Sequence, residues 1–331
     1  MAHTPPWFDG FEARDFDVGG TRIHARIGGR AGGTAGAPAL LLLHGFPHTH
    51  VMWHRVAQQL APHFCLVLAD LRGYGDSAKA PGLPDHANYS KRAMAQDMAA
   101  LMRALGHSRY GVCGHDRGGR VAHRLALDHP AAVSRLAVID IAPTLDMYSA
   151  TDMRFASAYY HWFHLIQPTP LPELMILGCW RDYLHAKLGG WGGKKGPHDA
   201  DASAPQGGAV GLGRPGVGAD LPHLEPQALA DYERCFSRPD TIHAMCEDYR
   251  ASAGIDLDHD RAARAAGEKI VCATLVLWGQ RGVINALFDP LALWRAQCAA
   301  AVQGECLPAG HYIPEELPGA TAKSLLAFFS A

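Results

Sequence analysis

The segment 110–120, with the sequence YGVCGHDRGGR, carries the residue types that most clearly suggest chemistry. Within it, Gly114-x-Asp116-x-Gly118 has the form G-x-Nu-x-G of a nucleophile elbow. In this motif the flanking glycines let the chain turn sharply, so that the central side chain is exposed. The segment lies between an expected strand and an expected helix, which is the context that the motif requires. Asp116 is therefore the candidate nucleophile.

A carboxylate at an elbow does different work from a serine. A serine alkoxide attacks carbonyl carbons, whereas a carboxylate displaces a leaving group from a saturated carbon and leaves an ester that water then cleaves. No G-x-S-x-G occurs in the chain, which disfavours a serine esterase. The aspartate elbow predicts hydrolysis of carbon-halogen bonds or of epoxides.

The second step needs a base and an acid that orients it. Among 20 histidines, His311 is favoured by its position after the last strand-like segment and before the final helix. Asp140 closes the apolar run 136–139, whereas the chain after Trp278 offers no carboxylate until Asp289. We therefore expect Asp140 to orient His311, although a turn or helix-capping role remains an alternative for this aspartate.

The segment His44-Gly-Phe-Pro47 follows an apolar run that ends at Leu43. A loop in this place donates a backbone N–H to the oxyanion formed when the ester is attacked, and Phe46 is the expected donor. The nearby histidines 44, 48 and 50 have no matching Asp, Glu or Cys spacing, so we expect neither a metal nor another cofactor.

Short apolar runs alternate with longer helical patterns, which is typical of an α/β protein with a mostly parallel sheet flanked by helices. The expected strands are 21–27, 38–43, 64–69, 109–113, 134–140 and 273–278. The expected helices include 90–105, 117–128 and 315–329. Between about 144 and 260 no good strand occurs, and we interpret this part as a helical insertion between two strands.

Composition excludes several classes of protein. The 331 residues include 30 basic and 32 acidic side chains, so no basic field for nucleic acid or anionic membrane is expected. No apolar run reaches the length of about 18 residues that a membrane span needs, and the first residues do not resemble a signal peptide. The 8 cysteines form no CxxC motif, which favours reduced thiols and a cytoplasmic location.

Together these residues resemble the α/β-hydrolase superfamily, and more closely the fluoroacetate (haloacetate) dehalogenases. The resemblance covers nearly the whole chain. It rests on HGFPHT at 44–49, DLRGYGDS at 70–77, GHDRGGR at 114–120, IDIAPT at 139–144, HW at 161–162, QPTPLPE at 167–173, CEDYRA at 246–251 and GHYIPEE at 310–316. It implies an α/β-hydrolase core, 1–143 and 261–331, with a helical cap, 144–260, inserted after the sixth strand.

The resemblance also implies roles for individual residues. Asp116 would be the nucleophile, His311 the base and Asp140 its partner. The carboxylate of a haloacid would be held by Arg117 and Arg120, and the departing halide would be received by His161, Trp162 and Tyr249. The two arginines share a face of the helix start, where cations oppose the helix dipole. A site for an anion explains them, and a surface salt bridge is the alternative. Packing in a helical core is the alternative for the halide residues.

The chain departs from the family in a glycine-rich loop at about 192–222. Just before it, Lys187 and Trp191 resemble pocket-lining positions of the cap. The loop leaves open the size of the substrate, the closure of the cap and the activity on fluoride. The resemblance suggests a homodimer, and a charged fraction of 19%, below the usual value of about 25%, agrees with buried subunit surface.

Three functions compete. Hydrolytic dehalogenation of a haloacetate to glycolate through an aspartyl ester is the leading one. An epoxide hydrolase shares the Asp-His-Asp triad and would use two tyrosines, for which Tyr159, Tyr160 and Tyr249 are candidates, but such enzymes commonly carry an aromatic residue where this chain has Arg117. A non-catalytic binding protein on the same fold is the third, and the complete set of candidate catalytic residues disfavours it.

Overall fold

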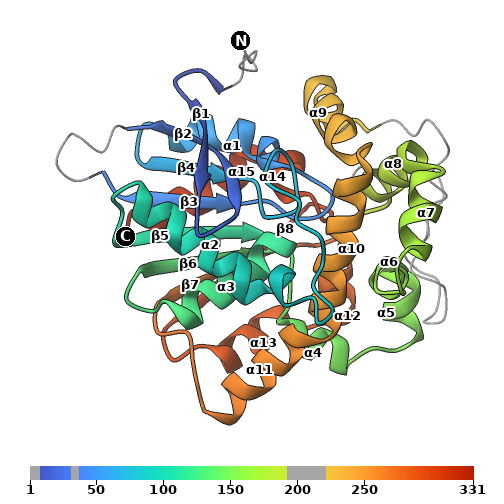
Figure 1. Cartoon of the computed structure of the whole chain (residues 1–331). Coiled ribbons are helices and arrows are strands. Elements are labelled where there is room, and N and C mark those ends of the chain that lie inside the picture. Colours follow the sequence, from blue (N-terminus) through green and yellow to red (C-terminus); the bar gives the residue numbers. More distant parts are fainter. Residues whose placement is uncertain (1–7, 31–36, 192–220) are drawn as a thin grey trace.

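A single sheet of eight strands forms the centre of the protein (Figure 1). The structure, a computed structural model, describes residues 8–30, 37–191 and 221–331. The strands are ordered β1-β2-β4-β3-β5-β6-β7-β8. Their bounds are Glu12–Asp17 for β1, Arg22–Gly29 for β2, Ala39–Leu43 for β3, Cys65–Ala69 for β4, Tyr110–His115 for β5, Val133–Ile139 for β6, Ala273–Gly279 for β7 and Val302–Leu307 for β8.

The sheet is mostly parallel, as the sequence predicts. From β4 through β3, β5, β6 and β7 to β8 every neighbouring pair is parallel, and only β1 with β2 and β2 with β4 are antiparallel. Every residue of β3 and β4 is buried, which explains their continuous apolar sequences, because helices cover both faces of a parallel sheet. All six expected strands are present.

The two strands that the sequence did not reveal, β1 and β8, are the edges of the sheet. The sequence of β1 is EARDFD and almost all of it is exposed, and the middle four residues of β8, QGEC, are exposed as well. Edge strands with polar, solvent-facing side chains carry no apolar run by which the sequence could identify them.

The helices that cover the sheet include the three that were expected. They are α1 His54–Leu60, α2 Lys91–Ala104, α3 Arg117–Asp128, α12 Val283–Leu287, α13 Pro290–Gln297, α14 Ile313–Glu316 and α15 Pro318–Phe329, with short 3-10 helices η2 His50–Trp53 and η3 Ala87–Tyr89. Ser90 caps α2, because its side chain accepts a hydrogen bond from the N–H of Ala93. The final expected helix is divided into α14 and α15, since Pro318 lacks a backbone N–H and starts a new helix.

Between β6 and β7 the chain forms a helical insertion, as expected. It contains α4 Thr144–Ser149, α5 Met153–Ala158, α6 Tyr160–Leu165, α7 Leu171–Leu177, α8 Trp180–Trp191, α9 Pro226–Phe236, α10 Pro239–Ala253 and α11 Ile255–Ala265. In Figure 1 the yellow-green helices α5 to α8 form an outer layer beside the sheet, with α10 on their inner side. The expected division into two domains stays a prediction, and its boundary near 260 falls within α11.

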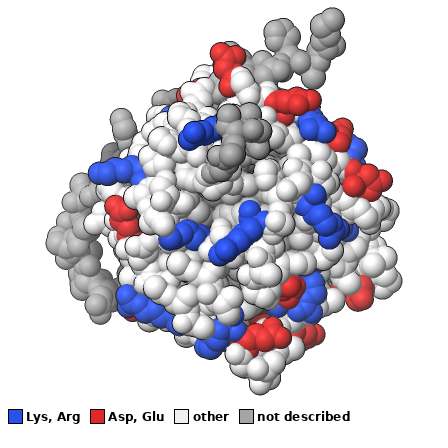
Figure 2. Space-filling view, turned by 90° about the vertical axis from the view of Figure 1, so that its left-hand side faces the viewer, with Lys and Arg blue, Asp and Glu red and all other residues white. Residues whose placement is uncertain are grey.

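The insertion covers the edge at which the parallel strands end (Figure 1). Figure 2 shows the left-hand face of Figure 1, where basic and acidic side chains are interspersed among uncharged surface and neither sign forms a continuous field on the described part. In the described ranges, no helix is both long and apolar enough to cross a membrane. Residues 192–220 of the glycine-rich loop lie outside the described residues.

Candidate active site

Asp116 lies at a sharp turn between β5 and α3, as the elbow motif predicts. Its backbone has φ 45° and ψ −115°, a conformation that side chains rarely adopt and that marks a strained, functional position. A Cβ atom on Gly114 would lie 2.3 Å from the carbonyl oxygen of Gly118, and one on Gly118 would lie 2.3 Å from that of His44. Both glycines are therefore required for the close packing that supports the turn.

The loop after β3 supplies a hydrogen bond to this aspartate. The backbone N–H of Phe46 donates to Oδ1 of Asp116 over 3.0 Å. A Cβ atom on Gly45 would lie 2.5 Å from Cβ of Asp116, so the loop approaches closely only because glycine is present. If Asp116 formed an ester through Oδ2, Oδ1 would be its carbonyl oxygen, and Phe46 would face the oxyanion that develops there.

His311 and Asp140 are brought together from distant parts of the chain. Nδ1 of His311 lies 2.5 Å from Oδ2 of Asp140, and the N–H of Gly279 donates to Oδ1 of Asp140 over 2.9 Å. Asp140 also has a positive φ, 51°. The last residue of β7 thus contributes a backbone donor to the carboxylate that follows β6. The structure therefore places His311 next to the acid that the sequence favours.

The electrostatics of this group suit a nucleophile and a base. Burial would raise the pKa of Asp116, but the charges of His311, His115 and Arg117 outweigh it and lower the pKa, so the carboxylate is ionised. Burial would lower the pKa of His311, but the hydrogen bond and charge of Asp140 raise it above the ordinary value. An ionised carboxylate, with an imidazole oriented by a second acid, can perform displacement followed by ester hydrolysis.

His115 is a functional candidate that the sequence analysis missed. It is fully buried at the end of β5, and its Nε2 lies 2.9 Å from the backbone carbonyl oxygen of His311. The two rings are 4.6 Å apart between centroids. The position of His115 between glycine and aspartate in the elbow was the available signal.

Arg117 begins α3 beside the nucleophile, but its guanidinium group, expected to hold a substrate carboxylate, already pairs with a carboxylate of the protein. Nε of Arg117 donates to Oδ2 of Asp248 over 2.8 Å, and Nη2 donates to Oδ1 over 2.9 Å. The fork is therefore occupied by a carboxylate from α10. Nη1 is buried and has no hydrogen-bond partner within the described ranges. One N–H edge of Arg117 remains to bind a further anion.

Arg120 is one helical turn farther along α3 and leaves a different atom unpartnered. Its Nη1 donates to the hydroxyl of Thr144 over 2.9 Å, and its Nη2 approaches the sulfur of Met147 at 3.2 Å. Nε is buried without a hydrogen-bond partner in the part of the chain that the structure describes. Buried donors without partners are costly, so Nη1 of Arg117 and Nε of Arg120 mark a place where an anion would be stabilised.

Asp248 is a second residue that the sequence analysis did not single out. It is fully buried, and besides Arg117 it contacts the ammonium group of Lys91 and accepts from the hydroxyl of Tyr74 over 2.6 Å. Burial would raise the pKa of Asp248, but Arg117 and Lys91 hold it far below its usual range. This ion pair connects α10 of the insertion with α2 and α3 of the core.

Two of the three residues expected to receive a halide, His161 and Tyr249, lie around the ring of Phe46. The ring of His161 stacks on Phe46 at 5.8 Å, and Tyr249 meets both rings at 5.5 Å. The guanidinium carbon of Arg117 lies 4.1 Å from the centre of the Tyr249 ring. Burial, with the charge of Lys187, holds the pKa of His161 well below its usual range, so its imidazole is neutral.

Trp162 is also buried, but its ring packs on Arg120 and Tyr148 rather than on Phe46. Its ring centre lies 4.8 Å from the guanidinium carbon of Arg120, and the ring packs 4.8 Å from that of Tyr148. The structure thus brings His161 and Tyr249 together directly, and the ring of Tyr159, which packs on both His161 and Trp162, connects Trp162 to them.

Lys187 lies on α8, within the insertion. Its Nζ is 3.7 Å from the centre of the Tyr160 ring, and burial lowers the pKa of this lysine to about 7. Its charge affects His161, which places it near the halide residues. The side chain of Trp191 lies outside the described residues.

Comparisons with known proteins show to which family the chain belongs. The model for the alpha/beta hydrolase fold matches residues 38–171. Over 98% of this chain and 95% of the relative, the sequence is 42% identical to a fluoroacetate dehalogenase from a Burkholderia species. The chain belongs to the fluoroacetate dehalogenase family of α/β hydrolases. The expected fold and family are both confirmed, and the protein is a hydrolase.

Other known proteins with the same fold are also similar to this member of the fluoroacetate dehalogenase family. A soluble epoxide hydrolase from a Corynebacterium species is 27% identical to this chain over 95% of each sequence. The crystal structure of ALR0039 from Nostoc sp PCC 7120, described provisionally as an alpha/beta hydrolase, is 48% identical and superposes with a TM-score of 0.85 over 97% of this chain and 98% of that one.

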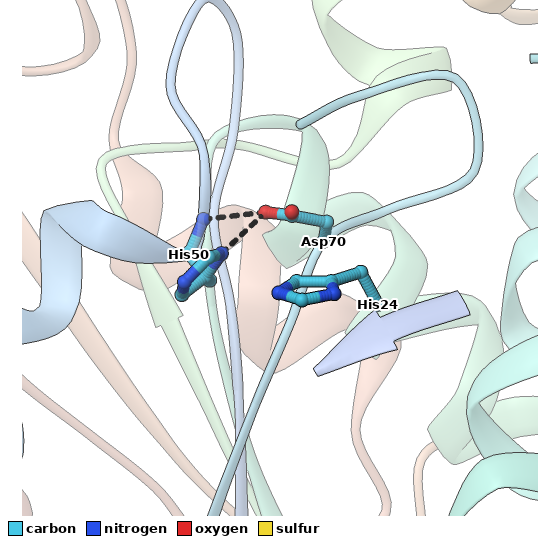
Figure 3. A group of neighbouring side chains, drawn as sticks. All are labelled: His24, His50 and Asp70. Atoms are coloured by element: carbon cyan, nitrogen blue, oxygen red, sulfur yellow. Dashed lines mark hydrogen bonds and ion pairs between the residues drawn. The ribbon is translucent and has the colours of Figure 1, made fainter. Parts of the chain in front are cut away.

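One cluster in this dehalogenase-family chain has the spacing of metal ligands, and hydrogen bonds explain it. Among the described residues, His24, His50 and Asp70 form that cluster (Figure 3). Both the backbone N–H and Nδ1 of His50 contact Oδ1 of Asp70, at 2.7 and 2.9 Å, while Nε2 of His50 accepts from Arg26 over 3.0 Å. No nitrogen of His50 is left to bind a metal, and the expectation of no metal stays a prediction.

Proposed function

We propose that this hydrolase removes halide from haloacetates and yields glycolate. The observation that carries the proposal is the pair of buried guanidinium donors, Nη1 of Arg117 and Nε of Arg120, beside the ionised carboxylate of Asp116. A substrate carboxylate would satisfy both donors with charge-assisted hydrogen bonds. It would be held by one donor from each arginine rather than by two forks, since Asp248 occupies the fork of Arg117.

The proposed reaction has two steps. Asp116 attacks the carbon that bears the halogen, a C–O bond forms, and the C–X bond breaks with both electrons leaving on halide. His311 then takes a proton from water, and the resulting hydroxide attacks the carbonyl carbon of the ester. The N–H of Phe46 would stabilise the oxyanion, because it already donates to Oδ1 of Asp116. When the tetrahedral intermediate collapses, its C–O bond to the glycolate oxygen breaks and the Asp116 carboxylate is regenerated. The glycolate oxygen takes one proton of the attacking water, and His311 releases the other to the solvent.

Neutral donors are proposed to stabilise the departing halide. The imidazole of His161, the indole of Trp162 and the phenol of Tyr249 each offer an N–H or O–H donor. Because the pKa of His161 is held low, it would donate as a neutral ring and would not trap the halide as an ion pair. The proposal extends to fluoride, for which such donors matter most.

The experiment is to measure halide release from chloroacetate and fluoroacetate beside the corresponding haloacetamides. Arg117→Lys and Arg120→Lys keep the charge but lose the planar donor. Each is therefore expected to lower kcat/KM for the acids by an amount equivalent to several kcal/mol of transition-state stabilisation. The effect on the amides should be much smaller. Arg124→Lys is the matched control, because Arg124 is buried on the same helix but pairs with Asp128. Equal losses for acid and amide would show that the arginines are structural.

Epoxide hydrolysis is the second candidate, and the relative from Corynebacterium favours it. Tyr159 and Tyr249 both pack on the ring of His161, at 5.3 and 5.5 Å, and are the tyrosines best placed to hold an oxirane oxygen. Tyr160 instead lies under Lys187 and is 46% exposed. Formation of diol from styrene oxide, without halide release from haloacetates, would move this candidate ahead.

The assembly and location of the protein are also proposals. A homodimer agrees with the low charged fraction of 19%, and a cytoplasmic location agrees with the 8 cysteines, which form no CxxC motif. It also agrees with the exposed apolar side chains of α7, namely Leu171, Leu174, Met175 and Leu177, because contiguous exposed apolar residues often mark an interface. Light scattering of the wild type and of Leu174→Glu tests this, and a monomeric wild type would contradict it.

A further inference from the structure

The loop that carries His311 is held on both sides by one carboxylate. His311 lies between β8, which ends at Leu307, and α14, which begins at Ile313. The N–H of Gly310 donates to Oε2 of Glu316 over 2.7 Å, and the N–H of Tyr312 donates to Oε1 over 3.0 Å. Glu316 therefore satisfies the backbone donors immediately before and after the histidine.

Other contacts complete this arrangement. The carbonyl oxygen of His311 lies 2.9 Å from Nε2 of His115, so the backbone of three consecutive residues is fixed by two side chains. The hydroxyl of Tyr312 donates to the carbonyl oxygen of Lys187 over 3.1 Å, which connects the loop to α8. The backbone of this loop therefore has little freedom to move His311 away from Asp116, and the contact with Asp140 orients its ring.

We propose that Glu316 is a positioning residue that holds His311 in line for the water that hydrolyses the aspartyl ester. The proposal rests on the proposed function for its kinetic consequence. Glu316 itself touches neither Asp116 nor the space beside it in any described contact. It acts through the backbone of the loop.

The chemistry of the contact explains why glutamate is needed. A carboxylate offers two acceptor oxygens and no donor, so it can satisfy both N–H groups at once. Glutamine would turn an NH2 group toward one of the two donors, and aspartate would keep the charge but is shorter by one methylene group. Arg281 approaches Oε2 at 3.3 Å from a partly exposed position and balances the charge.

The adjacent acid, Glu315, does not share this role. Its Oε1 accepts from the hydroxyl of Tyr232 over 2.7 Å, in the direction of α9. The two neighbouring glutamates thus support different elements, and Glu316 is the one directed at the catalytic loop.

Glu316 also contributes charge near His311, so its effect has a pH signature. Burial would lower the pKa of His311, while Asp140, Asp116 and Glu316 raise it. The other titratable side chains near this imidazole are His48, His115, His161 and Tyr312. Removing the charge of Glu316 should lower the pKa of His311, and the acid limb of activity should then move to lower pH, because the base must be neutral.

The kinetic experiment follows the ester on Asp116 by mass spectrometry during turnover of chloroacetate. Glu316→Gln and Glu316→Asp are expected to slow ester hydrolysis by about 10- to 100-fold, so the carboxymethyl adduct accumulates, while its rate of formation stays near that of the wild type. Glu305→Gln is the matched control, because Glu305 is exposed on β8 and contacts Ser324 instead of the loop. In a protein whose wild type releases halide, equal slowing of formation and hydrolysis, or no accumulation of adduct in the variants, would overturn the proposal.

The second experiment needs no substrate and separates the proposal from the proposed function. NMR titration of histidine labelled at Cε1, with His311 assigned by the His311→Asn variant, reports the pKa of the base directly. Glu316→Gln should lower it and Glu316→Asp should lower it less. An unchanged pKa in Glu316→Gln would overturn the electrostatic part even if dehalogenation is confirmed. If Glu316→Gln shows the predicted shift in the pKa of His311 but the wild type releases no halide, the role of Glu316 is supported and the proposed function is wrong.

Discussion

Two regions contribute to the candidate site. One is the end of the sheet at which the parallel strands finish, called the sheet edge below, and the other is the helical insertion. The two regions hold their side chains in different ways. At the sheet edge, Asp116 and Asp140 follow neighbouring strands, and both have a positive φ, 45° and 51°. Backbone groups of Phe46 and Gly279 meet their carboxylates. In the insertion, His161 and Tyr249 come from separate helices and are held by ring packing around Phe46.

This difference indicates which property each region controls. A side chain fixed by backbone geometry keeps its place when its chemistry is changed. Conservative substitutions at the sheet edge should therefore alter the reaction but leave the fold unchanged. A side chain held by packing shifts when its neighbours change. Substitutions in the insertion should therefore change affinity and halide preference more gradually.

The strongest test of the sheet edge is Asp116→Asn. The amide is nearly isosteric, so the turn is retained, but it is not a nucleophile, and we expect turnover to fall by about 10⁴-fold or more. Halide release measures the loss, and an unchanged thermal unfolding midpoint shows that the fold remains. Full activity in freshly purified protein, with deamidation excluded by mass spectrometry, would contradict the assignment of the nucleophile.

His311→Asn is expected to separate the two steps at the same edge. Displacement proceeds without the base, but the ester is not hydrolysed, so the peptide that contains Asp116 should gain the mass of a carboxymethyl group. Intact-protein and peptide mass spectrometry after incubation with chloroacetate measure this. An enzyme that turns over without any adduct would mean that either His311 or the covalent route is wrong.

Asp248→Asn tests the junction between the two regions. Arg117 is fully buried, so the loss of its partner charge should cost about 3–5 kcal/mol in the free energy of unfolding and lower kcat/KM for haloacetates by about 10- to 100-fold. Denaturant unfolding and halide release measure the two effects. Asp258→Asn on exposed surface of α11 is the control, and it should change stability by less than about 0.5 kcal/mol. Similar results for both variants would show that Arg117 does not depend on Asp248.

Tyr249→Phe, a change within the insertion, should give the smallest loss of activity among these variants. The loss of one O–H donor should cost about 1–3 kcal/mol in kcat/KM, with a larger loss for fluoroacetate than for chloroacetate because fluoride depends more on hydrogen bonding. Tyr110→Phe is the matched control, since its hydroxyl is buried without a hydrogen-bond partner in the described chain. An equal loss for both halides would remove Tyr249 from the halide site.

The sequence could predict most of the sheet edge because each feature there has a local cause. Gly114 and Gly118 are required by contacts with backbone atoms, and such contacts leave a motif that can be recognised. The edge strands β1 and β8 could not be predicted, because exposed strands need no apolar pattern. Ring packing around Phe46 leaves no such local pattern, and the resemblance alone suggested the halide residues.

The occupied fork of Arg117 could not be predicted either. Asp248 lies on a different element and has no spacing that relates it to the elbow, so only the folded structure shows the ion pair. His115 is a similar case, because its contact is with the backbone of a residue far along the chain. Long-range polar contacts of this kind are specified by topology rather than by any local pattern of residues.

The ion pairs of Asp248 also restrict the movement of α10 relative to the core. Moving α10 away from the sheet would separate this carboxylate from Arg117 and Lys91, and would leave buried charges without partners. The outer helices are joined differently, since Glu173 of α7 pairs with Arg250 and Arg181 of α8 pairs with Glu233, both inside the insertion. The buried ion pairs of Asp248 therefore fix α10 to α2 and α3 of the core, whereas the ion pairs of α7 and α8 hold the insertion together.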